Sequence, residues 1–326
     1  MAFTLYLASL DDLKITPYAY DHAWPLLYSQ LYNRCAIKYR LEAGREGRGG
    51  KLFIDSGAHS AHTKGSEVNV DEYIDYINER IDDVTVYAQV DKIPGRYRQE
   101  KTAQDFLDAP KLSWENYLYM HEKSADPDKL MPVFHQGEDL KWLENMCNYT
   151  FPDGSKVQYI GLSPRGDVTL RQKYDFSAEC FGIIQSSNNP NVKVHALGAT
   201  SLGMLERLPY YSADSTTWVL VSAYGQVWVP SDLFSDIITD DFTTGVKLGV
   251  SLENKVHPTN KEVYWFQNEA TRKRLDDYFE SIGTNLEELS TSHSRRAWAS
   301  AIFTQNWAKN YQYKGLKSFV KPKLLF

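Results

Sequence analysis

The sequence contains few cysteines, and the three present, Cys35, Cys147 and Cys180, are far apart. An odd number at such spacings does not form a disulfide framework, and no Cys-x-x-Cys pair is present to hold a metal. This cysteine usage is typical of a reducing compartment, so we expect a cytoplasmic protein.

Long apolar runs and a secretion signal are also absent. No apolar segment approaches the roughly 18 residues of a membrane-spanning helix. The first residues lack the basic start and the apolar stretch of a signal peptide. The sequence therefore predicts no membrane partner.

Two phosphate-binding motifs are missing as well. No Gly-x-Gly-x-x-Gly follows the first apolar segment, and no Gly-x-x-x-x-Gly-Lys-Ser/Thr occurs, so the doubly wound nucleotide-binding folds lose support. The net charge is −6. This value argues against a globally basic nucleic-acid binder, although a local basic patch would suffice.

What the sequence does contain is a repeated alternation of short apolar segments with amphipathic ones. We predict strands at 3–9, 51–59, 84–90, 130–134, 157–162, 192–197 and 210–214, and helices at 69–81, from 113, at 138–149, 169–185 and 201–208. Such alternation indicates parallel strands covered by helices. The predicted fold class is α/β, a (β/α)8 TIM-type barrel with a C-terminal helical, basic-aromatic extension.

The two predicted domains are a catalytic barrel over residues 1–255 and a helical extension over 256–326. The segments 226–229 and 247–250 are further candidate strands, and we expect one of them to close the barrel. A helix is predicted at 268–282, and 286–307 is predicted to be helical in part. Residues 36–50, with several Arg, Glu and Gly residues, predict a mobile polar loop.

Five predicted strands end on residues that suit a site: Asp55, Asp91, Gln136, Gly161 and Asp214. A single Asp at such a place could simply start an Asx turn. In a barrel, however, all these ends meet at one mouth, where such enzymes react. One carboxylate can form a covalent glycosyl intermediate while a second protonates the leaving group. A third acid beside a Gln can bond a guanine-like edge.

Metal chemistry is the rival interpretation. His59, His62, His135 and His195 lie near these strand ends, and barrel hydrolases hold metals with His and Asp. No His-x-His lies on a predicted strand, so we assign no metal ligands.

The chain from Ser292 to Phe326 has no acidic residue, and basic and aromatic side chains interleave along it. This composition suits a nucleic-acid backbone and unstacked bases. The alternative is a helix with an aromatic core face and a solvated basic side. The candidate nucleic-acid contacts are Arg295, Arg296, Lys309 and Lys314.

The ordered motifs resemble those of tRNA-guanine transglycosylases. Phe53-Ile-Asp55-Ser-Gly-Ala is similar to their Asp-Ser-Gly-Gly segment, and Phe134-His-Gln136-Gly and Tyr159-Ile-Gly161-Leu162 are similar to their Gln-Gly and Gly-Leu strand ends. His195-Ala-Leu-Gly198-Ala-Thr followed by Ala213-Asp214-Ser is similar to their Gly-x-Gly-Thr helix and Phe-Asp-Cys. The closer resemblance is to the phage DpdA-like 7-deazaguanine DNA transglycosylases. It rests on Ser113-Trp-Glu-Asn-Tyr, Pro132-Val-Phe-His-Gln-Gly and Tyr211-Ser-Ala-Asp-Ser-Thr-Thr-Trp.

The resemblance implies base exchange, in which guanine in DNA is replaced by a 7-deazaguanine such as preQ0. It implies that Asp214 is the nucleophile on C1′ and that Asp55 is the general acid/base. The base-binding residues it implies, with the neighbours of these motifs, are Asp91, Gln136, Gly161, Leu162, Ser56, His195 and Gly198. The expected partners are DNA and a free 7-deazaguanine base, in the host cytoplasm if the chain is phage-encoded.

One departure from the family concerns zinc. The tRNA enzymes carry a Cys-x-Cys-x-x-Cys and a later His that hold structural zinc, and this chain has no such cysteines. We therefore expect no cofactor and favour DNA over tRNA. The alternatives are a tRNA-guanine transglycosylase, a metal-dependent barrel hydrolase, and an inactive barrel that binds nucleic acid through its tail.

Overall fold

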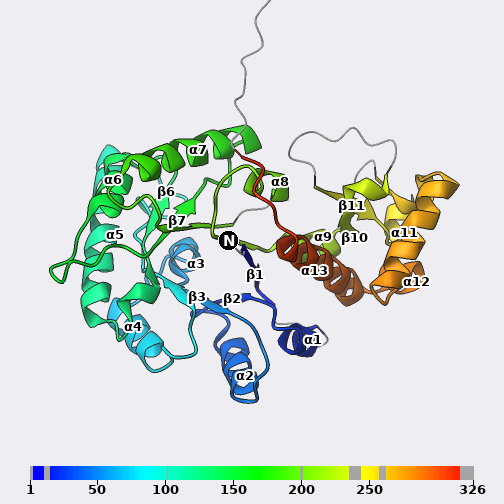
Figure 1. The fold of residues 1–326 in the computed structure, drawn as a ribbon, viewed down its shortest axis with the longest axis horizontal. Helices are drawn as coiled ribbons and strands as arrows, with labels where there is room; N and C mark the ends of the chain where they lie inside the picture. The colour runs from blue at the N-terminus through cyan, green and yellow to red at the C-terminus, as the bar shows by residue number, and fades with distance from the viewer. Residues whose placement is uncertain are drawn as a thin grey trace, which may run out of the picture.

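A ring of parallel strands forms the centre of the molecule (Figure 1). The computed structural model describes residues 3–10, 15–100, 102–198, 201–234, 244–256 and 262–315. The strands of the ring lie in the order β5-β4-β3-β2-β1-β9-β8-β7-β6. Their bounds are β1 (Thr4–Ala8), β2 (Leu26–Ser29), β3 (Leu52–Asp55), β4 (Val86–Ala88), β5 (Leu130–Met131), β6 (Val133–His135), β7 (Tyr159–Ser163), β8 (Lys193–Ala196) and β9 (Ser212–Ser215).

The ring closes at Pro132. β5 pairs with β4, β6 pairs with β7, and this one residue separates β5 from β6. Proline has no N–H to donate to a strand ladder, so it interrupts what is otherwise one strand. Counted as one strand, β5 and β6 make the sheet an eight-stranded barrel. The predicted (β/α)8 TIM-type fold is confirmed.

Alternate strand residues fill the inside of this barrel, as a closed sheet requires. The interior cluster is Tyr6, Phe53, Val86, Ala88, Met131, Val133 and Tyr159. Gly161 faces the same space, because a Cβ there would come 2.9 Å from Met131 Cε. A side chain at this position would have to displace the flexible end of Met131.

Helices cover the outside of the ring, as Figure 1 shows for α4 to α7. The barrel helices are α1 (Thr16–Asp21), α2 (Arg34–Arg45), α3 (Ala58–Thr63), α4 (Val70–Asn78), α5 (Ala103–Lys123), α6 (Lys141–Asn148), α7 (Leu170–Ser186), α8 (Leu202–Leu205) and α9 (Thr217–Ala223). Side chains of Asn69, Thr102 and Thr169 cap α4, α5 and α7. These caps satisfy free N–H groups at the helix starts and explain why the helices begin there.

The prediction of a mobile loop at 36–50 is wrong, because residues 36–45 belong to helix α2. Ile37 and Leu41 are buried one turn apart against the barrel. Arg40 is buried beside them, and its guanidinium donates to the carbonyl of Gly50. Because Arg40 is charged yet buried, the apolar face of this helix is hard to recognise in the sequence. The strand β2, just before this helix, was likewise not predicted.

The prediction that a segment near 226–229 or 247–250 closes the barrel is also wrong. β10 (Gln226–Pro230) and β11 (Gly245–Gly249) pair with each other, antiparallel and outside the ring. Neither strand is needed in the ring, because β1 pairs with both β2 and β9 and so joins the first and last strands of the barrel directly. Apolar content marked both segments as strands but could not identify their partners.

Four α-helices follow β11 within the described residues, with α11 and α12 away from the ring and α13 packed on the barrel beside β1 and α9 (Figure 1). They are α10 (Leu252–Val256), α11 (Glu269–Ser281), α12 (Leu286–Thr291) and α13 (His293–Lys309). Gln305 Nε2 donates to the carbonyl of Leu5 in β1 at 3.0 Å. Phe3 stacks on Tyr311 with ring centroids 4.3 Å apart. The extension therefore shares a core with the barrel. No helix within the described ranges is long and apolar enough to cross a membrane.

Candidate active site

Three carboxylates gather at the carboxyl ends of the barrel strands. Asp55 ends β3, Asp91 follows β4, and Asp214 lies in β9. The pKa of Asp55 is raised to about 7, chiefly by burial and then by the negative charge of Asp91. A hydrogen bond from Gly57 N at 2.9 Å opposes this shift, and Asp214 adds to it. Asp91 and Asp214 are therefore close enough to Asp55 for their charges to raise its pKa.

Asp214 is held by two donors on one of its oxygens. Gly198 N lies 2.8 Å from Asp214 Oδ1, and His195 Nε2 lies 3.1 Å from the same atom. Gly198 has a φ of 60°, in the left-handed region that favours glycine. No hydrogen bond from the described residues reaches Oδ2. With 8% exposure, Asp214 is oriented by the protein while one oxygen remains free to react.

A buried chain of hydrogen bonds supports His195 from behind. The ring is fully buried, and its Nδ1 lies 2.7 Å from Ser212 Oγ. Ser212 Oγ in turn lies 2.5 Å from the hydroxyl of Tyr159. If Tyr159 donates to Ser212 and Ser212 to Nδ1, the proton of neutral His195 is on Nε2 and points at Asp214. With this order of donors, the Nε2–H of His195 donates to Asp214 Oδ1.

Asp91 forms an ion pair inside the mouth. His135 Nε2 lies 2.8 Å from Asp91 Oδ2. Burial alone would raise the pKa of Asp91, but the hydrogen bond and charge of His135 lower it below its ordinary value. Burial alone would lower the pKa of His135, but Asp91 raises it above its ordinary value. Both shifts favour a protonated histidine beside an ionised carboxylate.

Gln136, next in the chain, has its amide bonded elsewhere. Its Oε1 accepts from Arg165 N at 3.0 Å, and its Nε2 donates to the carbonyl of Gln172 at 3.3 Å. Both partners belong to the chain that follows β7. Strand alternation explains the difference: Val133 lies in the interior cluster, so His135 lies on the interior side of the same strand. A base-binding role for Gln136 requires these two bonds to break.

The remaining predicted base-binding residues serve the local backbone in this structure. Gly161 N donates to the carbonyl of Pro132 at 2.8 Å, and the carbonyl of Leu162 accepts from Leu197 N at 3.0 Å. Ser56 is buried, and its Oγ accepts from Ala58 N at 3.3 Å at the start of α3. Their contact with a base stays a prediction.

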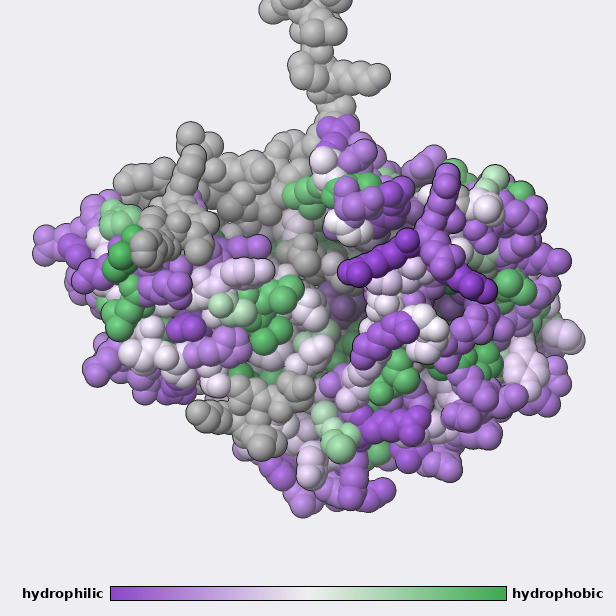
Figure 2. Space-filling model, turned by 180° about the vertical axis from the view of Figure 1, so that it is seen from behind, coloured by the Kyte–Doolittle hydropathy of each residue, from purple (hydrophilic) through white to green (hydrophobic). Residues whose placement is uncertain are grey.

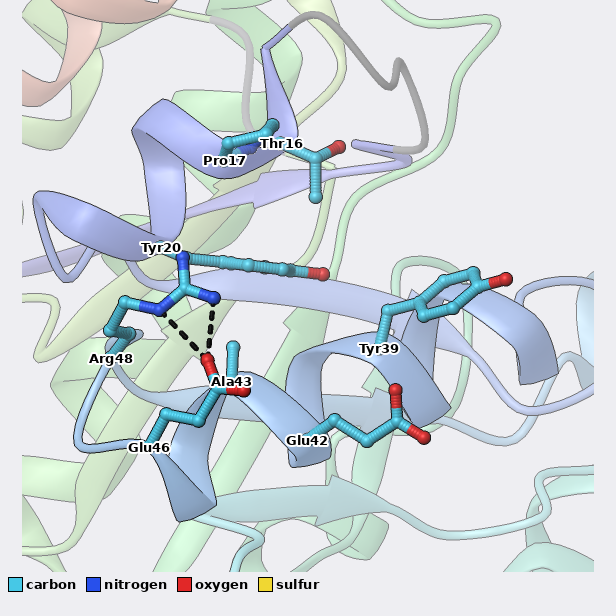
Figure 3. A pocket seen from close by; sticks show the side chains of 8 residues that line it. All are labelled: Thr16, Pro17, Tyr20, Tyr39, Glu42, Ala43, Glu46 and Arg48. Atoms are coloured by element: carbon cyan, nitrogen blue, oxygen red, sulfur yellow. Dashed lines mark hydrogen bonds and ion pairs between the residues drawn. The ribbon is translucent and has the colours of Figure 1, made fainter.

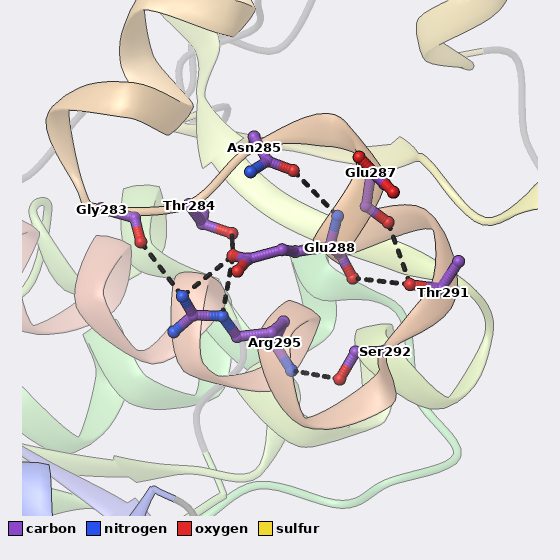
Figure 4. Close-up of polar contacts among 8 residues, drawn as sticks. All are labelled: Gly283, Thr284, Asn285, Glu287, Glu288, Thr291, Ser292 and Arg295. Carbon is purple, nitrogen blue, oxygen red and sulfur yellow. Dashed lines mark hydrogen bonds and ion pairs between the residues drawn. The ribbon is translucent and has the colours of Figure 1, made fainter.

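The C-terminal cations are largely engaged within the protein. Arg295 binds Glu288 Oε2 and the carbonyl of Gly283 (Figure 4). Arg296 is 8% exposed, and its guanidinium donates to the carbonyls of Ser222 and Leu289 at 3.1 and 2.8 Å. The side chain of Arg296 is therefore not placed to contact a nucleic acid in this structure. This residue no longer supports the prediction that the C-terminal segment binds nucleic acid.

Two further tail cations were predicted contacts. Lys314 pairs with Glu206, whereas Lys309 is exposed at the end of α13. The other basic residues of the predicted patch, Lys317, Lys321 and Lys323, lie outside the described residues.

Sequence reasoning missed the supporting roles of Ser212, Tyr159 and His135. Ser212 lies two positions before Asp214 in one strand, so the two side chains share a face. The same spacing relates His135 to Val133. Applying this alternation to each predicted strand end would have identified these residues.

The surface is hollowed near the middle of the face seen from behind, over the centre of the barrel (Figure 2). Strongly hydrophilic side chains gather on one side of this hollow. A separate pocket of about 280 Å³ lies between α1 and α2, outside the ring (Figure 3). Tyr20, Tyr39 and Arg48 are among its lining residues, and none of the predicted site residues is.

Within the described ranges, no group of three or more His, Cys, Asp and Glu side chains is arranged to hold a metal ion. No protein-family model matches the sequence, and no curated protein matches it.

Proposed function

We propose that this protein is a base-exchange glycosyltransferase that replaces guanine in DNA with a 7-deazaguanine. The observation that carries the proposal is the oriented Asp214 at the same mouth as Asp55, whose pKa is raised to about 7. One carboxylate suited to attack and another suited to proton transfer are what a double displacement at an anomeric carbon requires. The resemblance of the ordered motifs supplies the substrate class.

In the first half of the reaction, Asp214 acts as the nucleophile. Its free oxygen, Oδ2, forms a bond to C1′ of the target deoxyribose while the C1′–N9 bond breaks. The bonding electrons leave with guanine, which takes a proton from the carboxylic acid of Asp55. His195 and Gly198 N hold the other oxygen of Asp214 in place. The target nucleotide has to leave the base stack to reach this depth.

In the second half, the incoming base takes the place of guanine. Its N9–H gives a proton to the carboxylate of Asp55, and N9 bonds to C1′ as the ester to Asp214 breaks. A group that donates in one step and accepts in the next works best when its pKa is near the working pH. The raised pKa of Asp55 meets this condition near neutral pH.

Asp91 and His135 suit the recognition of a guanine-like edge. Asp91 uses Oδ2 for His135, so Oδ1 can accept an N–H of the base. Protonated His135 keeps a second ring N–H, on Nδ1, that can donate to the carbonyl oxygen of the base. This pair would perform the recognition that the resemblance assigns to Asp91 with Gln136. The absent zinc-binding cysteines support DNA rather than tRNA as the polymer.

The proposal is tested by base exchange itself. Guanine-containing DNA or tRNA is incubated with protein and 7-cyano-7-deazaguanine, and the nucleosides are then quantified by mass spectrometry after digestion. We expect incorporation into DNA that is lost in Asp214→Asn and Asp55→Asn. It should persist in the control Asp175→Asn, whose residue is exposed on α7 and pairs with Arg171. Incorporation into tRNA only would move the activity to RNA, and none in either polymer would contradict base exchange.

A further inference from the structure

We propose that Tyr32, Lys64, Tyr97 and Arg98 form a surface that holds the single-stranded DNA flanking the nucleotide bound in the barrel. We call these four residues the rim strip. The identity of the polymer rests on the proposed function, whereas the strip itself rests on the contacts and charges described below.

The rim strip lies on three successive loops at the carboxyl ends of β2, β3 and β4. Tyr32 follows β2, Lys64 ends α3 after β3, and Tyr97 and Arg98 lie between β4 and α5. Two of these strands also lead into Asp55 and Asp91. Because the carboxyl ends of barrel strands share one mouth, the strip borders the carboxylates. A strand bound along it would have its central nucleotide above them.

Ring and cation contacts join the loops into one continuous surface. Lys64 Nζ lies 4.1 Å from the centre of the Tyr32 ring. His62, two residues earlier in α3, meets the Tyr97 ring edge-on at 6.3 Å between centroids. Arg98 Cζ lies 5.2 Å from the centre of the same ring. The two tyrosines are thus linked through α3, and each has a cation over its face.

Both aromatic rings remain available to a ligand. Tyr32 is 44% exposed and Tyr97 is 43% exposed. Large aromatic side chains at this exposure are suited to base stacking, which tolerates any sequence. Arg98 has a φ of 58°, one of few non-glycine residues in the left-handed region among those described. Such a backbone is uncommon and often marks a functional loop.

Charge in these loops has the opposite sign to that of the whole chain. Residues 56–69 and 92–100 contain the cations Lys64, Lys92, Arg96 and Arg98 against two acids, Glu67 and Glu100. Lys92 is paired with Glu67 at 3.0 Å. Lys64, Arg96 and Arg98 form no ion pair with another described residue. In a chain of net charge −6, this local excess of cations fits phosphate groups.

The cations of the rim strip are more available to phosphate groups than the predicted C-terminal contacts Arg295, Arg296 and Lys314. Arg295, Arg296 and Lys314 are bonded to protein partners, whereas Lys64 and Arg98 lie over aromatic rings. A cation over an exposed ring is held weakly. A bound strand could therefore place its bases on the tyrosines while Lys64 and Arg98 turn to the phosphates.

The test measures binding of a short fluorescein-labelled DNA single strand by anisotropy, with Asp214→Asn as background to prevent covalent capture. The double variant Lys64→Gln/Arg98→Gln should bind more weakly. Its slope of log affinity against log salt should fall by about 1.4, or about 0.7 for each lost phosphate contact. Tyr32→Ala and Tyr97→Ala should each weaken binding by about fivefold or more. The matched control is Lys255→Gln/Lys273→Gln, which removes two exposed cations of the C-terminal helices α10 and α11 and should leave affinity unchanged.

If the strip variants and the parent have equal affinity and equal salt slope, the proposal that the rim strip binds DNA is refuted. A loss confined to the control would assign binding to the extension and would also overturn it. Strip-dependent binding without base exchange would leave the strip standing and refute the proposed reaction, so the two failures are distinguishable. All six positions are exposed, and unchanged urea midpoints would confirm that the variants fold.

Discussion

Asp55 should destabilise the folded protein at neutral and higher pH, and its replacement by Asn should remove this effect. The pKa of Asp55 rises from 3.8 to about 7 because of burial and the nearby charge of Asp91. Between these values the folded state binds more protons than the unfolded state, so stability falls as pH rises. The full shift corresponds to about 4 kcal/mol at 1.36 kcal/mol for each pKa unit. Asp55 is partly exposed, so solvent screening reduces this figure and we expect about 2 kcal/mol.

The assay is urea unfolding of the parent and Asp55→Asn at pH 5 and pH 8. Asn keeps a carbonyl oxygen to accept from Gly57 N, so the local turn is retained. The variant should gain about 2 kcal/mol over the parent at pH 8 and much less at pH 5. The control Asp175→Asn, an exposed residue on α7, should show no such difference between the two pH values. An equal gain at both pH values, or none at pH 8, would refute the raised pKa and with it the proton-transfer role of Asp55.

Three other outcomes follow from the site and its surroundings. Ser212→Ala breaks the hydrogen-bond chain that holds His195, the histidine that orients the nucleophile. Base exchange should therefore slow by about tenfold, corresponding to about 1.4 kcal/mol, while DNA affinity stays unchanged. An unaltered rate would contradict the orienting role. Asp91→Asn removes the partner that raises the pKa of His135, so the NMR titration midpoint of that ring should fall, and an unchanged midpoint would show that the pair does not form in solution. Arg296→Ala removes the guanidinium bonds to the buried carbonyls of Ser222 and Leu289, so it should lower the free energy of unfolding by about 1–3 kcal/mol. Lys309→Ala should lie within about 0.5 kcal/mol of the parent, and equal effects of the two would contradict the buried position of the arginine.

The barrel was predictable because its evidence is local and repeated. Largely apolar segments such as Leu52–Asp55 alternate with amphipathic helices such as Val70–Asn78, and α4, α5 and α7 each begin at a side-chain cap. Only a parallel sheet covered by helices satisfies many such units at once. Strand ends then placed Asp55 and Asp214 at one mouth without knowledge of any contact.

The parts that were not predictable depend on long-range partners. Helix α2 carries a buried Arg40, whose partner is the carbonyl of Gly50, and no local pattern shows that such a charge is satisfied. β10 and β11 are apolar enough for the barrel, but pairing is decided by the whole sheet. The orientation of His135 and Gln136 depends on strand register. A slip of one residue would exchange the sides of the strand on which these two side chains lie.

The central claim is a covalent bond between Asp214 and C1′ of the DNA, and peptide mapping tests it most directly. The protein would be mixed with guanine-containing DNA, denatured, and digested with nuclease and protease, and mass spectrometry would locate any deoxyribose adduct. We expect the adduct on the peptide that contains Asp214, fragmentation that places it on this carboxylate, and no adduct in Asp214→Asn. A deoxyribose on Asp55, on Asp91 or on another residue, or no adduct while exchange proceeds, would contradict the account.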